Sequence, residues 1–339
     1  MNHKRSRASG LIGIRGVAEV AGVSPMTASR ALSRPELVAA DTRRKVQEAA
    51  KAVGYVPNRL AGALSRHRTH VVGLVIPTLQ NLIATETIQG INAVLDARGI
   101  HLMIGEYGTS LAKEEELIHA FLAYRPSGLI LQSTVHTPAA AEVVRRAGIP
   151  VVETGNLIKA PLDSNVSFSN YAAAKAMTEY LIRRYRKVAY VGFAVAENDR
   201  TRDRRRGYAA ALRAAGRTVD PACMVDVPVR RQVGDRILVE LLQAQPDIDA
   251  IFFGGHWIAV EALIECYRRG IDVPGRIALA GLDDNDLSEK LPPGLTTVRI
   301  PRAEMGRRSA EGLLKRIDDP NAPPFRIDVG FEIVRRGSA

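Results

Sequence analysis

From about residue 70 onward, short apolar runs alternate with longer stretches whose apolar positions recur every three or four residues. The short runs predict buried strands over Val71–Ile76, His101–Ile104, Gly128–Leu131, Val151–Glu153, Val188–Phe193, Ala250–Phe253 and Ile277–Gly281. The longer stretches predict helices over Thr85–Arg98, Lys113–Tyr124, Asn170–Arg184, Arg204–Ala215 and Trp257–Arg269. This alternation favours a doubly wound α/β body, because parallel strands need crossover helices. It predicts either one large sheet or two similar lobes.

The chain before residue 57 has a different pattern, with three short helical segments. Small apolar residues between 16 and 21 lead to Gly22, which suits the left-handed conformation at a helix end. Ser24 is a natural N-cap for the next helix, Pro25–Leu32. A third helix is predicted over Ala40–Val53, with apolar residues on one face. The three segments together predict an all-α helix-turn-helix head.

The predicted helix Pro25–Leu32 carries side chains suited to DNA recognition. In a helix-turn-helix, the second helix lies in the major groove and its N-terminal residues face the base edges. Arg30 can bond guanine O6 and N7, and Met26 can contact a thymine methyl group. The predicted major-groove residues are Ser24, Pro25, Met26, Thr27, Ser29 and Arg30. A three-helix interaction domain with incidental charge is the alternative.

Positive charge is concentrated in the same part of the chain. The net charge is +11 and the isoelectric point is about 9.9. Residues 1–68 hold 13 Lys and Arg against 4 Asp and Glu, whereas the remainder holds 34 against 32. A basic module on a nearly neutral body is typical of nucleic-acid binding. A disordered basic tail is the alternative, although such a tail would lack apolar periodicity.

Composition and motifs exclude several classes of protein. No apolar run approaches the roughly 20 residues that cross a bilayer, so an integral membrane protein is excluded. The N-terminal residues lack the apolar core of a signal peptide, and the two cysteines are far apart; both features favour a cytoplasmic location. No GxGxxG, P-loop, HExxH or GxSxG motif is present, so no catalytic site, cofactor or metal is predicted. An enzyme or a sugar-binding protein with an incidental basic head remains the alternative.

Three ordered segments resemble the lactose-repressor (LacI/GalR) family of bacterial transcription regulators: Val17–Leu32, Thr42–Val46 and Gly54–Ala61. Gly16 and Ala39 stand where the family usually has Asp and Ser, so each position lacks a polar side chain near a helix start. The resemblance continues in the body at Gly281–Asp284, at Pro293–Val298 and in the arginine-rich run that ends at Gly207-Tyr208.

The resemblance implies a DNA-binding head, a hinge and a two-lobed body like that of periplasmic binding proteins. The expected parts are a basic tail at 1–12, the head at 13–56, the hinge at 57–69 and the effector-binding and dimerisation body at 70–339. One lobe is expected at about 70–167 and 298–323, and the other at about 168–297 and 324–339. The implied partners are double-stranded operator DNA, a small effector and a second copy of the chain, with no membrane. No leucine heptads follow Val334, so a homodimer is expected rather than a tetramer.

The hinge segment reads as a short helix that is marginal on its own. Pro57 interrupts the preceding structure, and Asn58 can cap a new helix of about two turns. In the family this segment folds on the operator and wedges a leucine into the minor groove, which by position is Leu64. The implied hinge contacts are Asn58, Arg59, Ala61 and Leu64. A plain interdomain linker is the alternative.

The resemblance also places an effector between the lobes. Arg204, three residues before Gly207, occupies the family's effector-binding arginine position, and a guanidinium binds a carboxylate with two parallel hydrogen bonds. Asp283 matches the family's acidic position and can accept bonds from hydroxyl groups. The predicted effector-binding residues are Arg204, Asp283, His256, Trp257 and Glu153. The alternative is a solvated charge run in which the arginines pair with neighbouring aspartates.

Four segments resemble the gluconate-repressor subgroup of the family and imply a sugar acid such as gluconate as the effector. They are Met26-Thr27, Glu106–Gly108, His136–Pro138 and Gly148–Glu153. Gly255 and His256 replace the family's usual Asn-Asp, and Ser169 stands where Asp is common. These departures leave open an altered effector or a lost response.

Overall fold

The computed structural model describes residues 13–56, 69–79, 82–228 and 233–339, without the side chains of residues 82 and 83. The chain divides into two compact units, residues 1–69 and residues 70–339. We call the first unit the head and the second the body. Across the described ranges, no helix is both long enough and apolar enough to cross a membrane.

The head contains three α-helices around a small core. Its elements are α1 (Ile14–Ala21), α2 (Pro25–Ser33), the 3-10 helix η1 (Pro35–Leu37) and α3 (Ala40–Ala52). Gly22 ends α1 with φ 66°, and the Ser24 hydroxyl caps α2 by accepting a bond of 3.0 Å from the Thr27 N–H. The buried core is made of Val17, Ala18, Ala28, Ala31, Val46, Ala49 and Ala50. The three predicted helices are confirmed, with ends shifted by one or two residues.

Ala39 is the N-cap of α3 and supplies no side-chain acceptor to the first helical N–H groups. The Ala39→Ser substitution should stabilise the head by about 1 kcal/mol, because a serine hydroxyl can accept one of those bonds. Native-state hydrogen exchange of the α3 amides in the full chain should slow about fivefold. Ala40→Ser places the hydroxyl inside the helix and should give no such protection. Equal or faster exchange in Ala39→Ser would contradict this expectation.

By contrast, Gly16 lies within α1, so its missing polar side chain is not at the cap.

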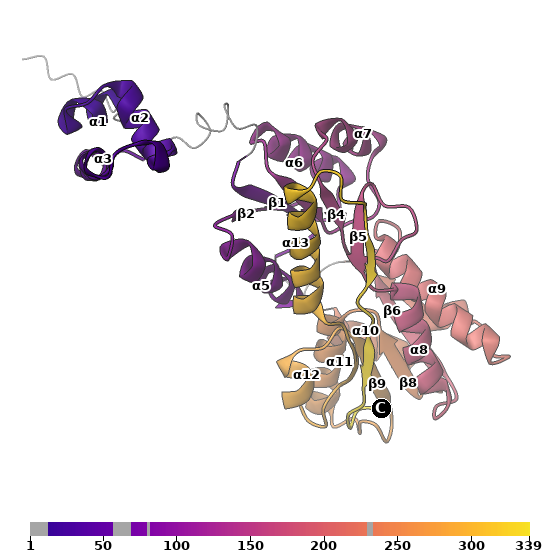
Figure 1. Ribbon diagram of the computed structural model, residues 1–339. Helices are drawn as coiled ribbons and strands as arrows, with labels where there is room; N and C mark the ends of the chain where they lie inside the picture. The colour runs from indigo at the N-terminus through magenta and orange to yellow at the C-terminus, as the bar shows by residue number, and fades with distance from the viewer. Residues whose placement is uncertain (1–12, 57–68, 80–81, 229–232) are drawn as a thin grey trace, which may run out of the picture. The chain divides into compact units, whose positions relative to one another are not determined.

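The first sheet of the body is wholly parallel, with strand order β11-β5-β4-β3-β1-β2. Its strands are β1 (Val71–Ile76), β2 (His101–Glu106), β3 (Gly128–Leu131), β4 (Val151–Glu153), β5 (Ser164–Ser167) and β11 (Arg326–Asp328). One face packs against α5 (Leu82–Asp96) and α13 (Arg302–Asp318), and the other against α6 (Leu111–Ala123) and α7 (Pro138–Ala147). Figure 1 shows α13 beside α5. Their close approach needs Gly90, where a Cβ would lie 2.0 Å from the Ala303 carbonyl oxygen.

The second sheet has the order β12-β10-β9-β8-β6-β7, and only β12 pairs antiparallel among these described strands. Its strands are β6 (Val188–Phe193), β7 (Met224–Val227), β8 (Ala250–Phe253), β9 (Ala278–Leu282), β10 (Thr296–Arg299) and β12 (Glu332–Val334). Helices α8 (Asn170–Ile182) and α9 (Asp199–Ala214) cover one face, and α10 (Gly234–Ala244) and α11 (His256–Arg269) cover the other. The short elements η2 (Pro221–Cys223) and α12 (Asp286–Lys290) complete this lobe.

The body therefore has two lobes, each a six-stranded sheet covered by helices, as one of the two predicted arrangements requires. The chain passes between the lobes after β5, between β10 and α13, and between β11 and β12. The last two passages lie slightly later than the expected boundaries of 298 and 324. The reason is that β10 stays in the second sheet to Arg299, while Arg326–Asp328 pairs with β5 in the first.

Candidate DNA-binding and effector sites

Helix α2 presents a polar face at its N-terminal end. Met26 is 70% exposed although it is a large apolar residue, and the Arg30 Nη2 atom lies 3.9 Å from its sulfur. The Ser24 and Thr27 hydroxyls bond each other at 2.9 Å and fix the helix start. Thr27 is half-buried, and the other predicted major-groove residues are exposed: Ser24, Pro25, Met26, Ser29 and Arg30. The structure thus places the predicted set along one helix, from the N-cap Ser24 to Arg30 in the last turn.

The predicted minor-groove contacts belong to the hinge. Asn58, Arg59, Ala61 and Leu64 lie outside the described residues. The leucine wedge therefore stays a prediction.

Arg204 lies in the second turn of α9, and its guanidinium is held by two neighbouring segments. Its Nε donates to Asn170 Oδ1 at 2.8 Å, and its Nη1 donates to the Gly254 carbonyl at 2.6 Å. The residue is 6% exposed, and burial lowers its pKa to about 10, so the group stays charged at neutral pH. Among the described residues, its Nη2 has no hydrogen-bond partner. A buried, fixed guanidinium with an unused nitrogen is suited to a ligand carboxylate.

Asp283 follows β9 and forms a buried ion pair with Arg302, the first residue of α13. Arg302 donates from Nε to Asp283 Oδ1 at 3.1 Å and from Nη2 to the same oxygen. Its guanidinium also lies 5.1 Å from the centre of the Phe168 ring. Asp283 has φ 74°, a left-handed conformation that aspartate adopts more readily than most residues. The Asp283 carboxylate, predicted to accept bonds from effector hydroxyl groups, is thus already partly bound by Arg302.

The sequence interpretation missed Arg302. It had singled out the arginine run because cations at a helix N-terminus oppose the helix dipole. Arg302 begins α13 and shows the same signal. The sequence analysis did not predict α13, so this signal could be used only once the start of that helix was known.

His256 connects α11 with the start of α12. Its Nε2 lies 2.7 Å from Ser288 Oγ, and its Nδ1 lies 3.3 Å from Asn285 Nδ2. Burial lowers the pKa of His256, so the ring is neutral at pH 7. In that state Nε2–H donates to Ser288 and Nδ1 accepts from the Asn285 amide. Because both ring nitrogens are engaged, His256 fixes the α12 cap rather than offering a free group.

Trp257 is half-buried and packs against the core of the second lobe. Its ring centroid lies 6.1 Å from that of Phe193, at an interplanar angle of 60°. A Cβ at Gly255 would come within 2.9 Å of the Phe193 ring. The aromatic pair therefore takes the space that the family's usual asparagine would need.

The start of α9 also joins the two lobes. Arg200 Nη1 donates to the Gln132 carbonyl at 2.7 Å, and Thr134 Oγ1 donates to Asp199 at 2.6 Å. Asn156 Nδ2 donates to Asp203 at 2.7 Å. In each of these bonds, a residue that follows β3 or β4 meets one in α9. Part of the arginine run thus has a structural role that the sequence interpretation did not include.

Glu153 ends β4, and its carboxylate is used inside the first lobe. Its Oε1 lies 3.2 Å from His136 Nε2, and its Oε2 accepts the Leu162 N–H. His136 Nδ1 lies 3.0 Å from Glu114 Oε2, and the histidine side chain is 5% exposed. Burial lowers the pKa of His136, but the hydrogen bonds and charges of Glu114 and Glu153 outweigh burial and raise it to about 9. Glu153 therefore has a structural explanation.

This cluster predicts a pH-dependent stability of the body. An unfolded histidine has a pKa near 6.5, so the charged His136 stabilises the fold fully below about pH 6.5 and progressively less up to about pH 9. The free energy of unfolding in urea, followed by the fluorescence of the single tryptophan Trp257, should fall by about 1–3 kcal/mol between pH 6.5 and 8.5. His136→Gln should flatten this fall, while His119→Gln, which changes an exposed histidine on α6, serves as the control. An equal slope in His136→Gln and the wild type would refute the assignment.

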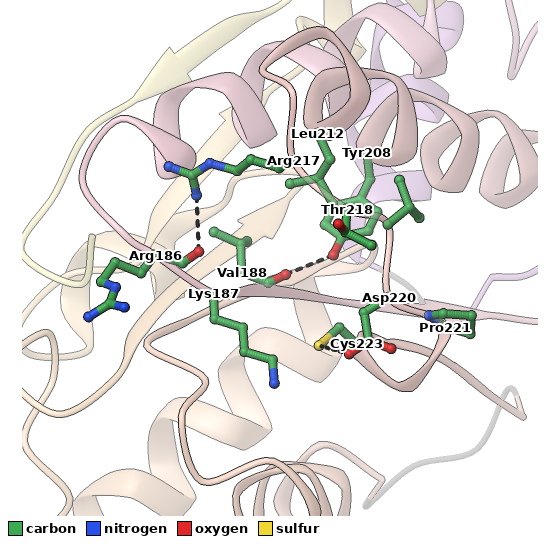
Figure 2. Close-up of a pocket in the computed structure, with 11 residues that line it drawn as sticks. Arg186, Lys187, Val188, Tyr208, Leu212, Arg217, Thr218, Asp220, Pro221 and Cys223 are labelled. Atoms are coloured by element: carbon green, nitrogen blue, oxygen red, sulfur yellow. Dashed lines mark hydrogen bonds between the residues drawn. The ribbon is translucent and has the colours of Figure 1, made fainter.

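A separate pocket of about 600 Å³ lies beside the start of β6 (Figure 2). The Tyr208 hydroxyl donates to the Val188 carbonyl there, and Arg217 donates to backbone carbonyls. The Lys187 ammonium pairs with Asp247. This pocket lies at the amino ends of the strands, whereas Arg204 and Asp283 lie near the carboxyl ends. Ligands of doubly wound folds bind at the carboxyl ends, so the geometry favours the Arg204 region.

A helix-turn-helix head with an exposed basic recognition helix, together with a two-lobed α/β body, defines a DNA-binding regulator with a ligand-binding module. Residues 13–58 match the bacterial regulatory proteins of the lacI family, and residues 178–339 match a periplasmic binding protein-like domain. The chain belongs to the lacI family, and it is a DNA-binding transcriptional regulator.

The similarity to relatives extends over nearly the whole chain. The HTH-type transcriptional regulator GntR of Pseudomonas aeruginosa is 38% identical over 340 residues, which cover 99% of this chain and 98% of that protein. The HTH-type transcriptional regulator GntR of Escherichia coli K12 is 35% identical and covers 96% of this chain and 98% of its own. A solved LacI-family regulator from Silicibacter pomeroyi has a TM-score of 0.90 at 33% identity, over 96% of this chain and 99% of that one.

Proposed function

We propose that the protein represses genes of sugar-acid catabolism and leaves its operator when a gluconate-like acid binds between the lobes of the body. Two heads of a homodimer read a near-palindromic operator, and the hinge helices bend its centre. The protein acts in the cytoplasm by binding rather than by catalysis.

The observation that carries the proposed effector class is the state of Arg204. It is buried, charged and fixed by Asn170 and the Gly254 carbonyl, and its Nη2 has no partner among the described residues. Arg204 Nη2 is not among the buried atoms that lack a partner, so it is open to a ligand, and a carboxylate can bond it with charge assistance. The effector must bind the two arrangements of the lobes with different affinity, because only a differential affinity shifts the population.

Isothermal titration calorimetry of the full-length protein with gluconate tests the effector class. We expect saturable binding with one site per chain. If gluconate gives no heat of binding while another sugar acid or a sugar phosphate does, Gly255 and His256 mark an altered effector. If no acid binds, the proposed effector class is wrong.

A further inference from the structure

Asp283 after β9 and Arg302 of α13 form an ion pair whose charges both act on Arg204 of α9. Asp283 pairs with Arg302, and its charge also acts on Arg204, where it partly offsets the lowering of the arginine pKa by burial. The positive charges of Arg302 and Arg200 lower the pKa of Arg204, because like charges disfavour its charged form. Asp283 therefore lies within electrostatic reach of two arginines, but its hydrogen bonds go to Arg302 alone among the described residues.

Without Arg302, Asp283 would be the natural counter-ion of Arg204. A carboxylate close to that guanidinium would compete with the carboxylate of any ligand. The pairing with Arg302 prevents this, because both Nε and Nη2 of Arg302 bond Asp283 Oδ1. The Phe168 ring packs against the Arg302 guanidinium and keeps it in place.

Two other carboxylates, Asp284 and Glu86, lie within electrostatic reach of this pair. Asp284 is engaged by Arg336 and Arg299. Glu86 of α5 is influenced by both Arg302 and Asp283, and burial raises its pKa. Asp283 is thus the carboxylate that acts most strongly on Arg204, and it is held by Arg302.

We infer that Arg302 determines the charge specificity of the effector site: it withdraws Asp283 from Arg204, so that Arg204 binds an acid in preference to a neutral polyol. This inference rests on the proposed function and specifies its selectivity. Gluconate and sorbitol provide the matched probes, because they share a six-carbon polyol chain and differ at C1, which is a carboxylate in one and a hydroxymethyl group in the other.

The test measures the ratio of the gluconate and sorbitol affinities by calorimetry. Arg302→Gln should lower this ratio at least about tenfold, because the released Asp283 cancels one nearby positive charge. The double variant Asp283→Asn/Arg302→Gln removes both charges and should restore the ratio to within about threefold of the wild type. Asp283→Asn alone should keep or raise it. Arg308→Gln, an exposed arginine on the same helix, is the control and should change nothing.

The results of this test distinguish a failure of the inference about Arg302 from a failure of the proposed effector class. An unchanged ratio in Arg302→Gln overturns the inference, and so does a double variant that stays as unselective as the single one. Arg302→Gln leaves a buried carboxylate unpaired, so its unfolding in urea is measured in parallel. If Arg302→Gln does not fold, the affinity ratios of Asp283→Asn and of the double variant are compared with that of the wild type. A loss of the acid preference in the double variant then contradicts the inference. If the wild type binds neither gluconate nor another sugar acid, the proposed effector class fails, and the inference fails with it.

Discussion

Arg204→Ala should abolish the response to the effector while leaving DNA binding intact. The substitution removes a buried guanidinium whose free nitrogen faces no protein partner among the described residues, and with it the charge-assisted bonds to a ligand carboxylate. Loss of one partner of such a buried charge pair costs about 2–5 kcal/mol, so gluconate affinity should fall by a factor of about 30 or more. The measurement is calorimetric titration with gluconate, together with operator affinity at the same salt concentration.

The control for this substitution is Arg202→Ala. Arg202 lies in the same helix, is exposed and donates to the Ala196 carbonyl. The Arg202→Ala substitution should leave the gluconate affinity and the operator affinity unchanged. An Arg204→Ala protein that still releases its operator with gluconate would show that the effector binds elsewhere.

Arg30→Ala should relax the operator specificity at one base pair in each half-site. Arg30 is exposed on α2, one turn after Met26, and its two nitrogens can bond guanine in the major groove. Removal of such a contact costs about 1–3 kcal/mol, which is roughly a 5- to 150-fold loss of discrimination. Competition between the operator and single-base variants of it measures the effect.

Arg44→Ala gives the matched comparison for Arg30. Arg44 is exposed on α3 and pairs with Asp41. Arg44 lies outside the recognition helix, so its loss should change the affinities for all duplexes by the same factor. If Arg30→Ala also weakens every duplex by the same factor, Arg30 is a phosphate contact and the reading of α2 changes.

The hydrophobic pattern predicted the elements that contain continuous or periodic apolar residues. It failed for elements whose buried or neighbouring side chains are polar or charged. All seven strands predicted for the body are present. Strand β5, Ser164–Ser167, was missed although it is fully buried, because three of its four side chains are polar and some of these find partners inside the lobe. The Asn165 amide, for example, donates to the Glu153 and Asn156 carbonyls. Helix α13 was missed because its many charged residues hide the few apolar ones that pack against the sheet.

In the candidate site, too, the sequence identified some residues and missed others. Arg204, Asp283 and His256 could be singled out because their positions match a family pattern. Their partners could not, because the pair of Arg302 with Asp283 and the pair of His256 with Ser288 join residues 19 and 32 positions apart. Such contacts depend on how loops and helix starts meet after folding, and periodicity contains no information about them. The partners change the interpretation, since they show that the aspartate and the histidine are already engaged by other side chains.

The central claim is that one chain combines specific DNA binding with control by a sugar acid. The most direct test is titration of the full-length protein onto a labelled duplex from its own upstream region, with and without gluconate. Salt must be fixed and competitor DNA present in excess, because phosphate contacts alone give salt-dependent binding to any duplex. We predict tight binding that gluconate weakens by about tenfold or more. Binding no tighter than that of the competitor would contradict the assignment as a specific regulator, and tight binding unaffected by any sugar acid would contradict its proposed control.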